Sequence, residues 1–346
     1  MVILGAGASF DSSPDFVPNA ASGADGGGGP WRPPLAKDLF RDRERKFGEL
    51  VVKYPKLTHI LPYLRSASTG GVEHALELLQ DQGKTNPESL RELAAVKFYL
   101  CDLLMRVTDE WTSRTNGVTN YVPLIREILR LDQTGEEVCI VTFNYDLLLE
   151  RALVSFPDFE MKGPEEFLSS HPRLKIFKLH GSVNWSRTVG TSGALYTPNQ
   201  IIEQADSLQP SDRFVPANAA REYGAGHAYG SVFPAIAIPV QTKTEGHFEC
   251  PLAHREHLIG ILPRITKILI IGWRAREAHF LQMLRGKVRK LQRVMVVGAH
   301  KPDAEGTLAE FLGAYLVDVR STSAAEGGFT SFIVNHEGDE FLAAQD

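Results

Sequence analysis

Cysteine is scarce in this chain of 346 residues, which holds only Cys101, Cys139 and Cys250. The three lie far apart in the sequence, and none belongs to a CxxC pair. This spacing excludes a disulfide framework, the usual support of small secreted domains. We therefore expect a reducing, cytoplasmic setting.

Long apolar runs and an excess of positive charge are also missing. No apolar run approaches the roughly 18 residues that a membrane span needs, and no basic segment precedes the opening apolar strand. We expect a protein that is neither exported nor embedded in a membrane, and an abrupt opening of this kind predicts a truncated or misassigned start. The net charge of −5 argues against a surface devoted to nucleic-acid phosphates.

The composition that is present, 43% hydrophobic and 23% charged residues, is typical of a globular protein with a sizeable core. Short apolar runs separated by helical stretches indicate strands of a parallel sheet with helices as crossovers. We predict an α/β fold, a Rossmann-like doubly wound and mostly parallel sheet, in a single domain over residues 1–346. The expected strands lie at residues 1–4, 137–143, 174–181, 235–240, 265–273 and 293–298.

A long segment between the first two expected strands, residues 35–135, is helical in pattern. Its apolar residues recur at helix spacing, as Val96, Leu100, Leu103 and Val107 illustrate. The segment therefore predicts a helical insertion in the sheet domain.

Two stretches favour flexible loops because their composition supports neither helix nor strand. Residues 17–34 include four consecutive glycines and four prolines, and residues 186–232 are rich in Gly, Ser, Pro and Ala.

The first strand ends in the glycine-rich stretch Gly5-Ala6-Gly7-Ala8-Ser9. Glycines allow backbone N–H groups, here those of residues 7–9, to approach an anion such as a pyrophosphate. The dehydrogenase fingerprint is incomplete, since no third glycine and no acidic strand end follow, and the GK[ST] of a P-loop is absent. A tight turn without a ligand explains the stretch equally well.

Polar side chains follow two later strands, at residues 142–146 (TFNYD) and 178–182 (KLHGS). The carboxyl ends of parallel strands are where open α/β sheets bind ligands. A helix N-cap would account for Asn144 or Asp146, although not for both. His180 is also compatible with a buried histidine beside a turn glycine.

The three stretches in this order resemble the SIR2 (sirtuin-like) superfamily, specifically its bacterial branch of defence-associated NAD+ hydrolases. Ile271-Gly272-Trp273 resembles the later glycine turn of that branch, and Val296-Val297-Gly298 lies where the family contacts adenosine. The similarity covers roughly residues 1–315. It implies NAD+ as substrate, bound by Gly5, Ala6, Gly7, Ala8, Ser9, Asp146, Gly272, Trp273 and Gly298.

The resemblance also implies a mechanism. Asn144 would lie beside C1′ of the ribose and accept a hydrogen bond from the attacking water, while Asp146 engages the nicotinamide amide or the ribose. His180, with an unperturbed pKa of roughly 6.5, would accept a proton. The expected activity is an NAD+ glycohydrolase that yields nicotinamide and ADP-ribose, or a cyclic ADP-ribose, and depletes NAD+ in antiphage defence.

No metal is expected, because the zinc module of deacylating sirtuins needs two CxxC pairs that this chain lacks. His247, Cys250, His254 and His257 supply four possible ligands within 11 residues. Structural sites usually take their ligand pairs from two separate elements, so we favour a helix start with incidental histidines.

The resemblance further implies a homo-oligomer, or a partner such as a hexameric DNA-translocating ATPase or an Argonaute-like protein, with nucleic acid bound only through that partner. Two other functions remain open. One is a sensor or assembly scaffold that binds NAD+ or ADP-ribose with little catalysis. The other is a nuclease subunit working with a translocase, supported only by the basic residues between Arg285 and Arg293.

Overall fold

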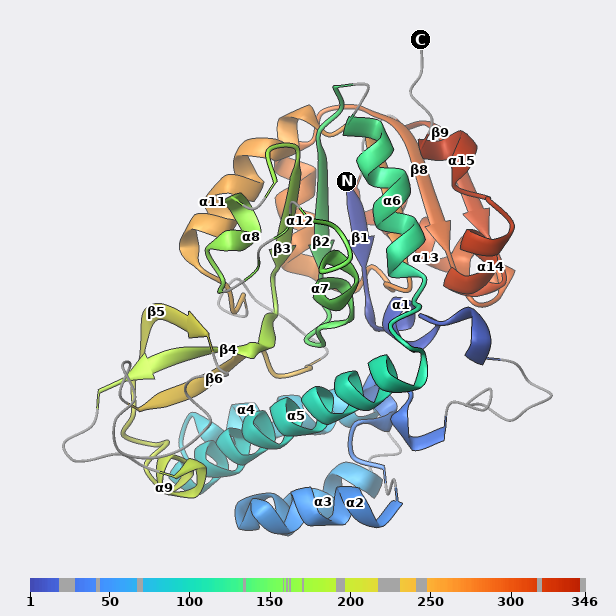
Figure 1. Ribbon diagram of the computed structural model, residues 1–346. Coiled ribbons are helices and arrows are strands. Elements are labelled where there is room, and N and C mark those ends of the chain that lie inside the picture. The colour runs from blue at the N-terminus through green and yellow to red at the C-terminus, as the bar shows by residue number, and fades with distance from the viewer. Residues whose placement is uncertain are drawn as a thin grey trace.

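A six-stranded parallel sheet forms the centre of the molecule (Figure 1). The computed structural model describes residues 1–18, 29–41, 44–66, 71–132, 135–157, 159, 161, 163–169, 171–190, 197–216, 231–240, 248–315 and 319–342. The strands run in the order β3-β2-β1-β7-β8-β9, and every neighbouring pair is parallel. They are β1 (Val2–Leu4), β2 (Val138–Thr142), β3 (Leu174–Lys178), β7 (Lys267–Ile271), β8 (Leu291–Val297) and β9 (Val319–Ala325).

Helices cover both faces of this sheet, so the predicted Rossmann-like, doubly wound fold is confirmed. In Figure 1, α6 (Tyr121–Asp132) and α7 (Leu148–Leu153) lie in front of the strands, with α12 (Ala278–Lys287) and α13 (Lys301–Tyr315) behind them. Burial on both faces explains why β1, and β7 after Lys267, are continuous runs of Val, Ile and Leu rather than alternating patterns. Further helices among the described residues of this lobe are α1 (Ala6–Phe10), α8 (Glu166–Ser169), α11 (Leu252–Ile261), α14 (Gly328–Val334) and α15 (Asp339–Leu342).

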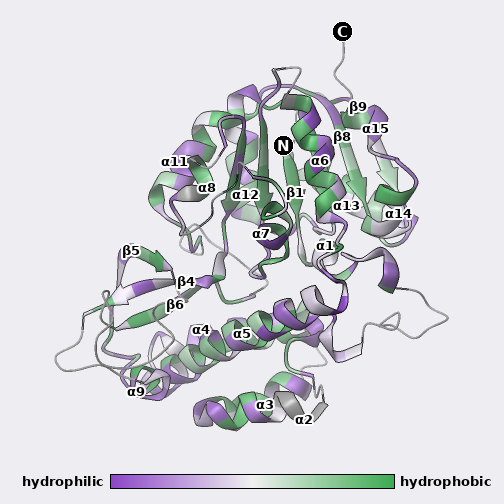
Figure 2. Ribbon diagram, in the orientation of Figure 1, coloured by the Kyte–Doolittle hydropathy of each residue, from purple (hydrophilic) through white to green (hydrophobic). Residues whose placement is uncertain are grey.

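A second lobe with its own hydrophobic core lies below the carboxyl ends of β1, β2 and β3 in Figure 1. Its longest element is α5 (Pro87–Arg114), which begins at Pro87 because the Asn86 side chain accepts the backbone N–H of Glu88. Figure 2 shows polar and apolar residues alternating along α5, as expected of a helix with one buried face. The second lobe also contains the described helices α2 (Glu44–Lys53), α3 (Pro55–Ser66), α4 (Gly71–Gly83) and α9 (Pro198–Glu203).

A three-stranded antiparallel sheet completes the second lobe, with β4 (Gly181–Val189) between β5 (Pro210–Pro216) and β6 (Val232–Ile236). We expected residues 235–240 to form a strand of the parallel sheet, and this expectation is wrong. The run is apolar because it joins the core of the second lobe, where Ile236, Ile238 and Val240 are buried. An apolar run indicates burial and leaves the choice of sheet open.

The prediction of a loop at residues 186–232 is also wrong for the described part of that segment. This part contains the end of β4, all of α9 and β5, and the start of β6. A capping box between Thr197 and Gln200 starts α9 despite the loop-like composition. Residues 191–196 and 217–230 lie outside the described residues, as do residues 19–28 of the other expected loop.

Residues 35–135 contain α2 to α6, and within the described part of this segment we find no strand. The last of these helices, α6, packs against the parallel sheet rather than the second lobe. In the described parts of the chain, none of the helices combines the length and the apolar character needed to cross a membrane.

Candidate active site at the topological switch point

The neighbours β1 and β7 mark the point where the strand order reverses. From β1 the chain goes on to β2 and β3 on one side, and from β7 to β8 and β9 on the other. Open α/β sheets bind ligands in the crevice outside the carboxyl ends at this point. The residues that follow the two strands are Gly5 and Gly272, both among the expected NAD+ contacts.

The two glycine turns at the switch point pack backbone against backbone. The Gly5 N–H donates to Ile271 O at 3.0 Å, and the Gly7 N–H donates to Gly272 O, also at 3.0 Å. A Cβ at Gly5 would stand 2.5 Å from Gly272 O, and one at Gly7 would stand 2.8 Å from Gly272 Cα. Glycine is therefore required here by the close approach of the turns themselves.

The backbone amides that we expected to hold a pyrophosphate have partners within the turns. Gly7 N–H donates to Gly272 O, and Ala8 N–H donates to Gly5 O at 2.9 Å as α1 begins. This geometry gives no support to an anion contact at Gly7 and Ala8, and the tight-turn explanation accounts for both glycines. Of this stretch, Ala6 is exposed while Ala8 and Ser9 are buried.

Asn144, which follows β2, reaches across to the β1 turn. Its Nδ2 donates to Gly5 O at 2.9 Å and to Ser9 Oγ at 3.0 Å. A carbonyl oxygen can only accept, so the contact with Gly5 determines which end of the amide is nitrogen. The other end, Oδ1, is buried and has no hydrogen-bond partner among the described residues. The structure thus presents an oriented, unsatisfied acceptor at the switch point.

A buried tyrosine lies behind this contact. Tyr121, the first residue of α6, has its hydroxyl 2.9 Å from Ser9 Oγ. Burial raises the pKa of Tyr121 far above its usual range, and the charge of Asp146 raises it further, whereas the hydrogen bond with Ser9 lowers it. The phenol therefore stays protonated at every physiological pH.

His180 is brought to the same region by contacts between aromatic rings. Its side chain is 1% exposed, and its ring centroid lies 4.8 Å from that of Phe143. Phe143 in turn stacks on Trp273 with a centroid separation of 5.2 Å and an interplanar angle of 15°. The Trp273 indole N–H donates to Glu277. The turn after β7 and the end of β3 thus meet on the two sides of Phe143.

A second histidine, His279 on α12, was not expected from the sequence. It is buried, with its ring centroid 6.4 Å from that of His180 and 4.3 Å from that of Phe248. His279 belongs to no motif, and neither does Tyr121. Their helical patterns indicate only burial, so sequence reasoning had no signal for either.

Asp146 has a structural role in addition to its expected one. Its Oδ1 accepts the Leu148 N–H at 3.0 Å at the start of α7. The N-cap position itself is Leu147, so neither Asp146 nor Asn144 is the N-cap residue. The Asp146 backbone oxygen accepts from Lys178 Nζ at 2.6 Å, and the same Nζ donates to Glu150 Oε1 at 2.6 Å. Burial raises the pKa of Glu150, and the ammonium of Lys178 opposes that shift.

Gly298 lies at the same edge of the sheet, following β8, the strand beyond β7. Its N–H donates to Ala325 O at 3.0 Å, and a Cβ there would stand 2.9 Å from Ala304 N at α13. Packing of strand end against helix explains this glycine, and the structure places it away from the Asn144 contacts.

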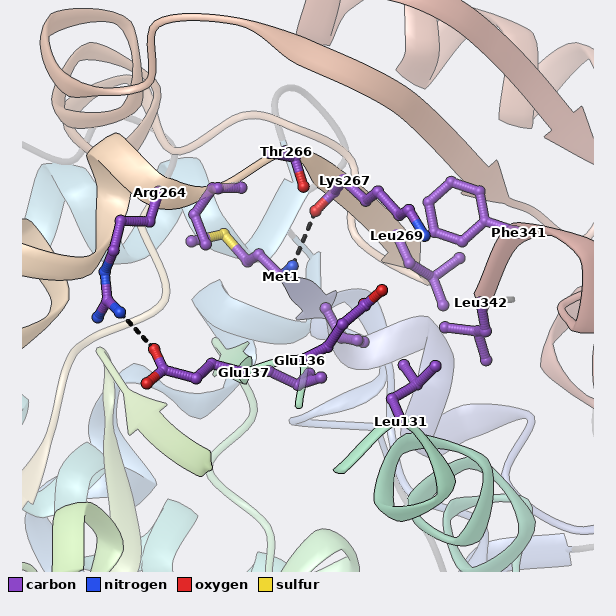
Figure 3. A pocket seen from close by; sticks show the side chains of 13 residues that line it. Met1, Leu131, Glu136, Glu137, Arg264, Thr266, Lys267, Leu269, Phe341 and Leu342 are labelled. Atoms are coloured by element: carbon purple, nitrogen blue, oxygen red, sulfur yellow. Dashed lines mark hydrogen bonds and ion pairs between the residues drawn. The ribbon is translucent and has the colours of Figure 1, made fainter. Parts of the chain in front are cut away.

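A small cavity opens at the opposite edge, where β1, β2 and β7 begin (Figure 3). Met1, Glu137, Arg264 and Lys267 are among its lining residues, and Arg264 pairs with Glu137 at 2.5 Å. Its volume of about 70 Å³ holds a few waters and is far too small for a dinucleotide.

His254, one of the histidines around Cys250, has a different partner. The His254 Nε2–H donates to Pro164 O at 2.8 Å, and burial lowers the pKa of His254 to about 4. Burial raises the pKa of the Cys250 thiol to about 12, which disfavours the thiolate that binds zinc. His247 lies outside the described residues, and within those described no group of three or more His, Cys, Asp or Glu could hold a metal ion.

Residues 138–218 match the family of the SIR2-like domain, a segment that includes both Asn144 and His180. This part of the chain is therefore SIR2-like. Among solved structures, this SIR2-like chain is similar to Sir2Tm bound to a propionylated peptide, with 13% identity, a TM-score of 0.37 and coverage of 99% of this chain and 93% of the other. It is also similar to a Sir2 homolog in complex with NAD, with 13% identity, a TM-score of 0.38 and coverage of 99% and 90%. No curated protein matches the chain.

Proposed function

We propose that this SIR2-like chain is an NAD+ glycohydrolase, which cleaves the nicotinamide–ribose bond with water. The observation that carries the proposal is the Asn144 Oδ1 atom, a buried acceptor without a partner among the described residues, oriented at the switch point by Gly5 and Ser9. NAD-dependent chemistry is the general class of activity that the SIR2-like match over residues 138–218 supports.

The reaction needs orientation more than strong acid catalysis. The bond between C1′ and the pyridinium nitrogen breaks, its electron pair stays on nicotinamide, and the ring leaves as a neutral molecule. The ribose passes through an oxocarbenium-like state, and the water oxygen forms the new bond to C1′ while losing a proton. In our proposal Asn144 Oδ1 accepts a hydrogen bond from that water, and His180 accepts a proton from the water or from a ribose hydroxyl.

Positive charge for the pyrophosphate is available on the turn after β7. Arg274 and Arg276 are exposed there, on either side of Ala275, whose φ of 54° is unusual for a residue other than glycine. Two guanidinium groups beside the switch point would attract a dinucleotide, in place of the amides at Gly7 and Ala8. Asp146, Gly272, Trp273 and Gly298 keep their proposed roles as NAD+ contacts.

The wider role is proposed on the resemblance alone. We propose that the enzyme acts in the cytoplasm in antiphage defence, where depletion of NAD+ stops the infected cell. We further propose that it forms a homo-oligomer or works with a hexameric translocating ATPase or an Argonaute-like partner. Either arrangement would keep a toxic activity repressed until infection.

Purified protein incubated with NAD+ should release free nicotinamide, and chromatography should resolve ADP-ribose or a cyclic product beside it. Asn144→Ala should lower the rate of release by at least about 100-fold, because the water loses its acceptor. This variant also breaks two buried hydrogen bonds, so we expect it to lose roughly 1–3 kcal/mol of stability.

Asn86→Ala is the matched control, since it removes the α5 N-cap at a cost of about 1 kcal/mol far from the site and should keep full turnover. Full turnover in Asn144→Ala would exclude the mechanism. Absence of nicotinamide release from the wild-type protein, with ADP-ribose bound, would indicate a sensor instead.

A further inference from the structure

Tyr121 is the residue of α6 that reaches the candidate active site. It is 1% exposed, and its hydroxyl lies 2.9 Å from Ser9 Oγ, which in turn accepts from Asn144 Nδ2 at 3.0 Å. We propose that Tyr121 is a positioning residue, which acts through Ser9 to hold the Asn144 amide in its productive orientation. This inference rests on the proposed function and names a residue that neither motif nor family match includes.

The hydrogen bonds of Asn144 show why a second support is needed. Its Nδ2 has two protons, one directed to Gly5 O and one to Ser9 Oγ. Gly5 O belongs to the rigid backbone of the β1 turn, whereas Ser9 Oγ can rotate among three staggered positions. The contact with Tyr121 selects the position in which Ser9 meets the amide. The plane of the amide, and with it the direction of Oδ1, therefore depends on the phenol.

The chemistry of the phenol suits this role. Burial raises the pKa of Tyr121 well above its usual range, so the group stays a neutral hydroxyl across the working pH range. A neutral hydroxyl keeps its bond to Ser9 whichever of the two oxygens donates. It places no charge beside Asn144 Oδ1, the atom proposed to accept from water.

The ring of Tyr121 is held independently of its hydroxyl. It packs edge to face against Phe329 of α14, with centroids 5.4 Å apart and an interplanar angle of 71°. Tyr121→Phe therefore keeps the aromatic packing and removes only the hydroxyl. A matched control exists in Tyr99 of α5, which is equally buried, stacks on Phe40 and donates its hydroxyl to Leu39 O.

We expect Tyr121→Phe to lower kcat for nicotinamide release by roughly 10-fold or more, since small displacements of a positioned group are costly. KM for NAD+ should stay within about two-fold, because the amide direction matters more in the transition state than in binding. Tyr99→Phe should lose similar thermal stability and keep the wild-type kcat. An undiminished kcat in Tyr121→Phe overturns the proposal.

A double-mutant cycle tests the route through Ser9. Ser9→Ala should lower kcat at least as much as Tyr121→Phe does, and adding Tyr121→Phe to Ser9→Ala should cause no further loss. Losses that multiply would show that Tyr121 acts independently of Ser9, which overturns the proposal.

A measurement that needs no turnover separates this inference from the proposed function. Hydrogen exchange of the Asn144 side-chain NH2, followed by NMR, should become faster in Tyr121→Phe and stay unchanged in Tyr99→Phe. If the wild-type protein releases no nicotinamide, the proposed function fails while faster exchange still supports positioning by Tyr121. Unchanged exchange in Tyr121→Phe overturns the positioning role.

Discussion

Lys178 and Glu150 form an almost fully buried ion pair directly behind Asp146. The Lys178 side chain is 1% exposed and that of Glu150 is 10% exposed, and their Nζ and Oε1 atoms lie 2.6 Å apart. Since Lys178 Nζ also donates to the Asp146 backbone oxygen, the pair supports the residues that follow β2. Removing one partner of a buried pair leaves the other charge uncompensated.

We predict that Lys178→Met lowers the free energy of unfolding by about 3–5 kcal/mol, measured by urea denaturation. Burial already raises the pKa of Glu150, and without the ammonium the ionised carboxylate is unfavourable in the fold. The carboxyl group binds a proton as the pH falls through that raised pKa, so the loss of stability should be smaller at pH 5 than at pH 8. The double variant Lys178→Met/Glu150→Leu should recover most of the loss. A double variant no more stable than the single one would contradict this account.

Sequence reasoning reached the residues whose place follows from topology. Asn144 and His180 were predictable because parallel strands bring their carboxyl ends to one edge, where the ordered stretches place both residues. Tyr121 and His279 could not be found in this way, because each lies on a helix that returns to the edge only through tertiary packing. The engagement of the Gly7 and Ala8 amides depends on the distance between two turns, which no local pattern specifies.

Among the elements, the turns after β1 and β7 are the most tightly constrained. Gly272 has a φ of 63°, and a Cβ there would stand 2.1 Å from Ala8 N. We predict that Gly272→Ala destabilises the protein by more than the roughly 1–2 kcal/mol that a left-handed backbone alone costs, because the clash is with backbone. Thermal unfolding measures the effect.

A glycine-to-alanine substitution should instead stabilise the protein at Gly306, in the exposed middle of α13. A Cβ there would meet nothing within 4 Å. Gly306→Ala should raise stability by about 0.5–1 kcal/mol through helix propensity. A neutral Gly272→Ala would mean that the close approach of the two turns is not a feature of the folded protein.

Helices and strands were predictable from the sequence where the spacing of apolar residues fits only one kind of element. The long helical insertion has a clear period, and the runs at β2, β7 and β8 are typical of strands buried on both faces. The apolar run at residues 235–240 has two possible meanings, and only contact with α5 assigns it to the second lobe. The edge strand β9 was missed because its residues Arg320, Ser321 and Thr322 are exposed and polar.

At the scale of the whole molecule, one buried histidine makes global stability depend on pH. His254 is 1% exposed, and its ring meets that of Trp185 edge to face with centroids 5.7 Å apart. The folded pKa is lowered from 6.5 to about 4, so between these values the unfolded chain binds a proton that the folded chain does not. The contribution of His254 to stability should therefore fall by roughly 3 kcal/mol as the pH drops from 6.5 to 4.

Denaturation at a series of pH values measures this slope. His254→Gln keeps a hydrogen-bond donor for Pro164 O without a titrating ring, and should flatten that part of the profile. His59→Gln changes an exposed histidine on α3 and should keep the wild-type profile. Identical profiles in the wild-type protein and His254→Gln would assign the dependence to other groups.

The hydrogen-bonded contact between the two glycine turns limits how the molecule can move. β1 and β7 are paired from Val2 to Leu4 and are then joined again by the bonds of Gly5 and Gly7 to Ile271 and Gly272. Separating the two strands would break this continuous series of hydrogen bonds, so their carboxyl ends are held at a fixed distance. A rearrangement at this end of the sheet would therefore have to come from displacement of the second lobe, the helical lobe built around α5.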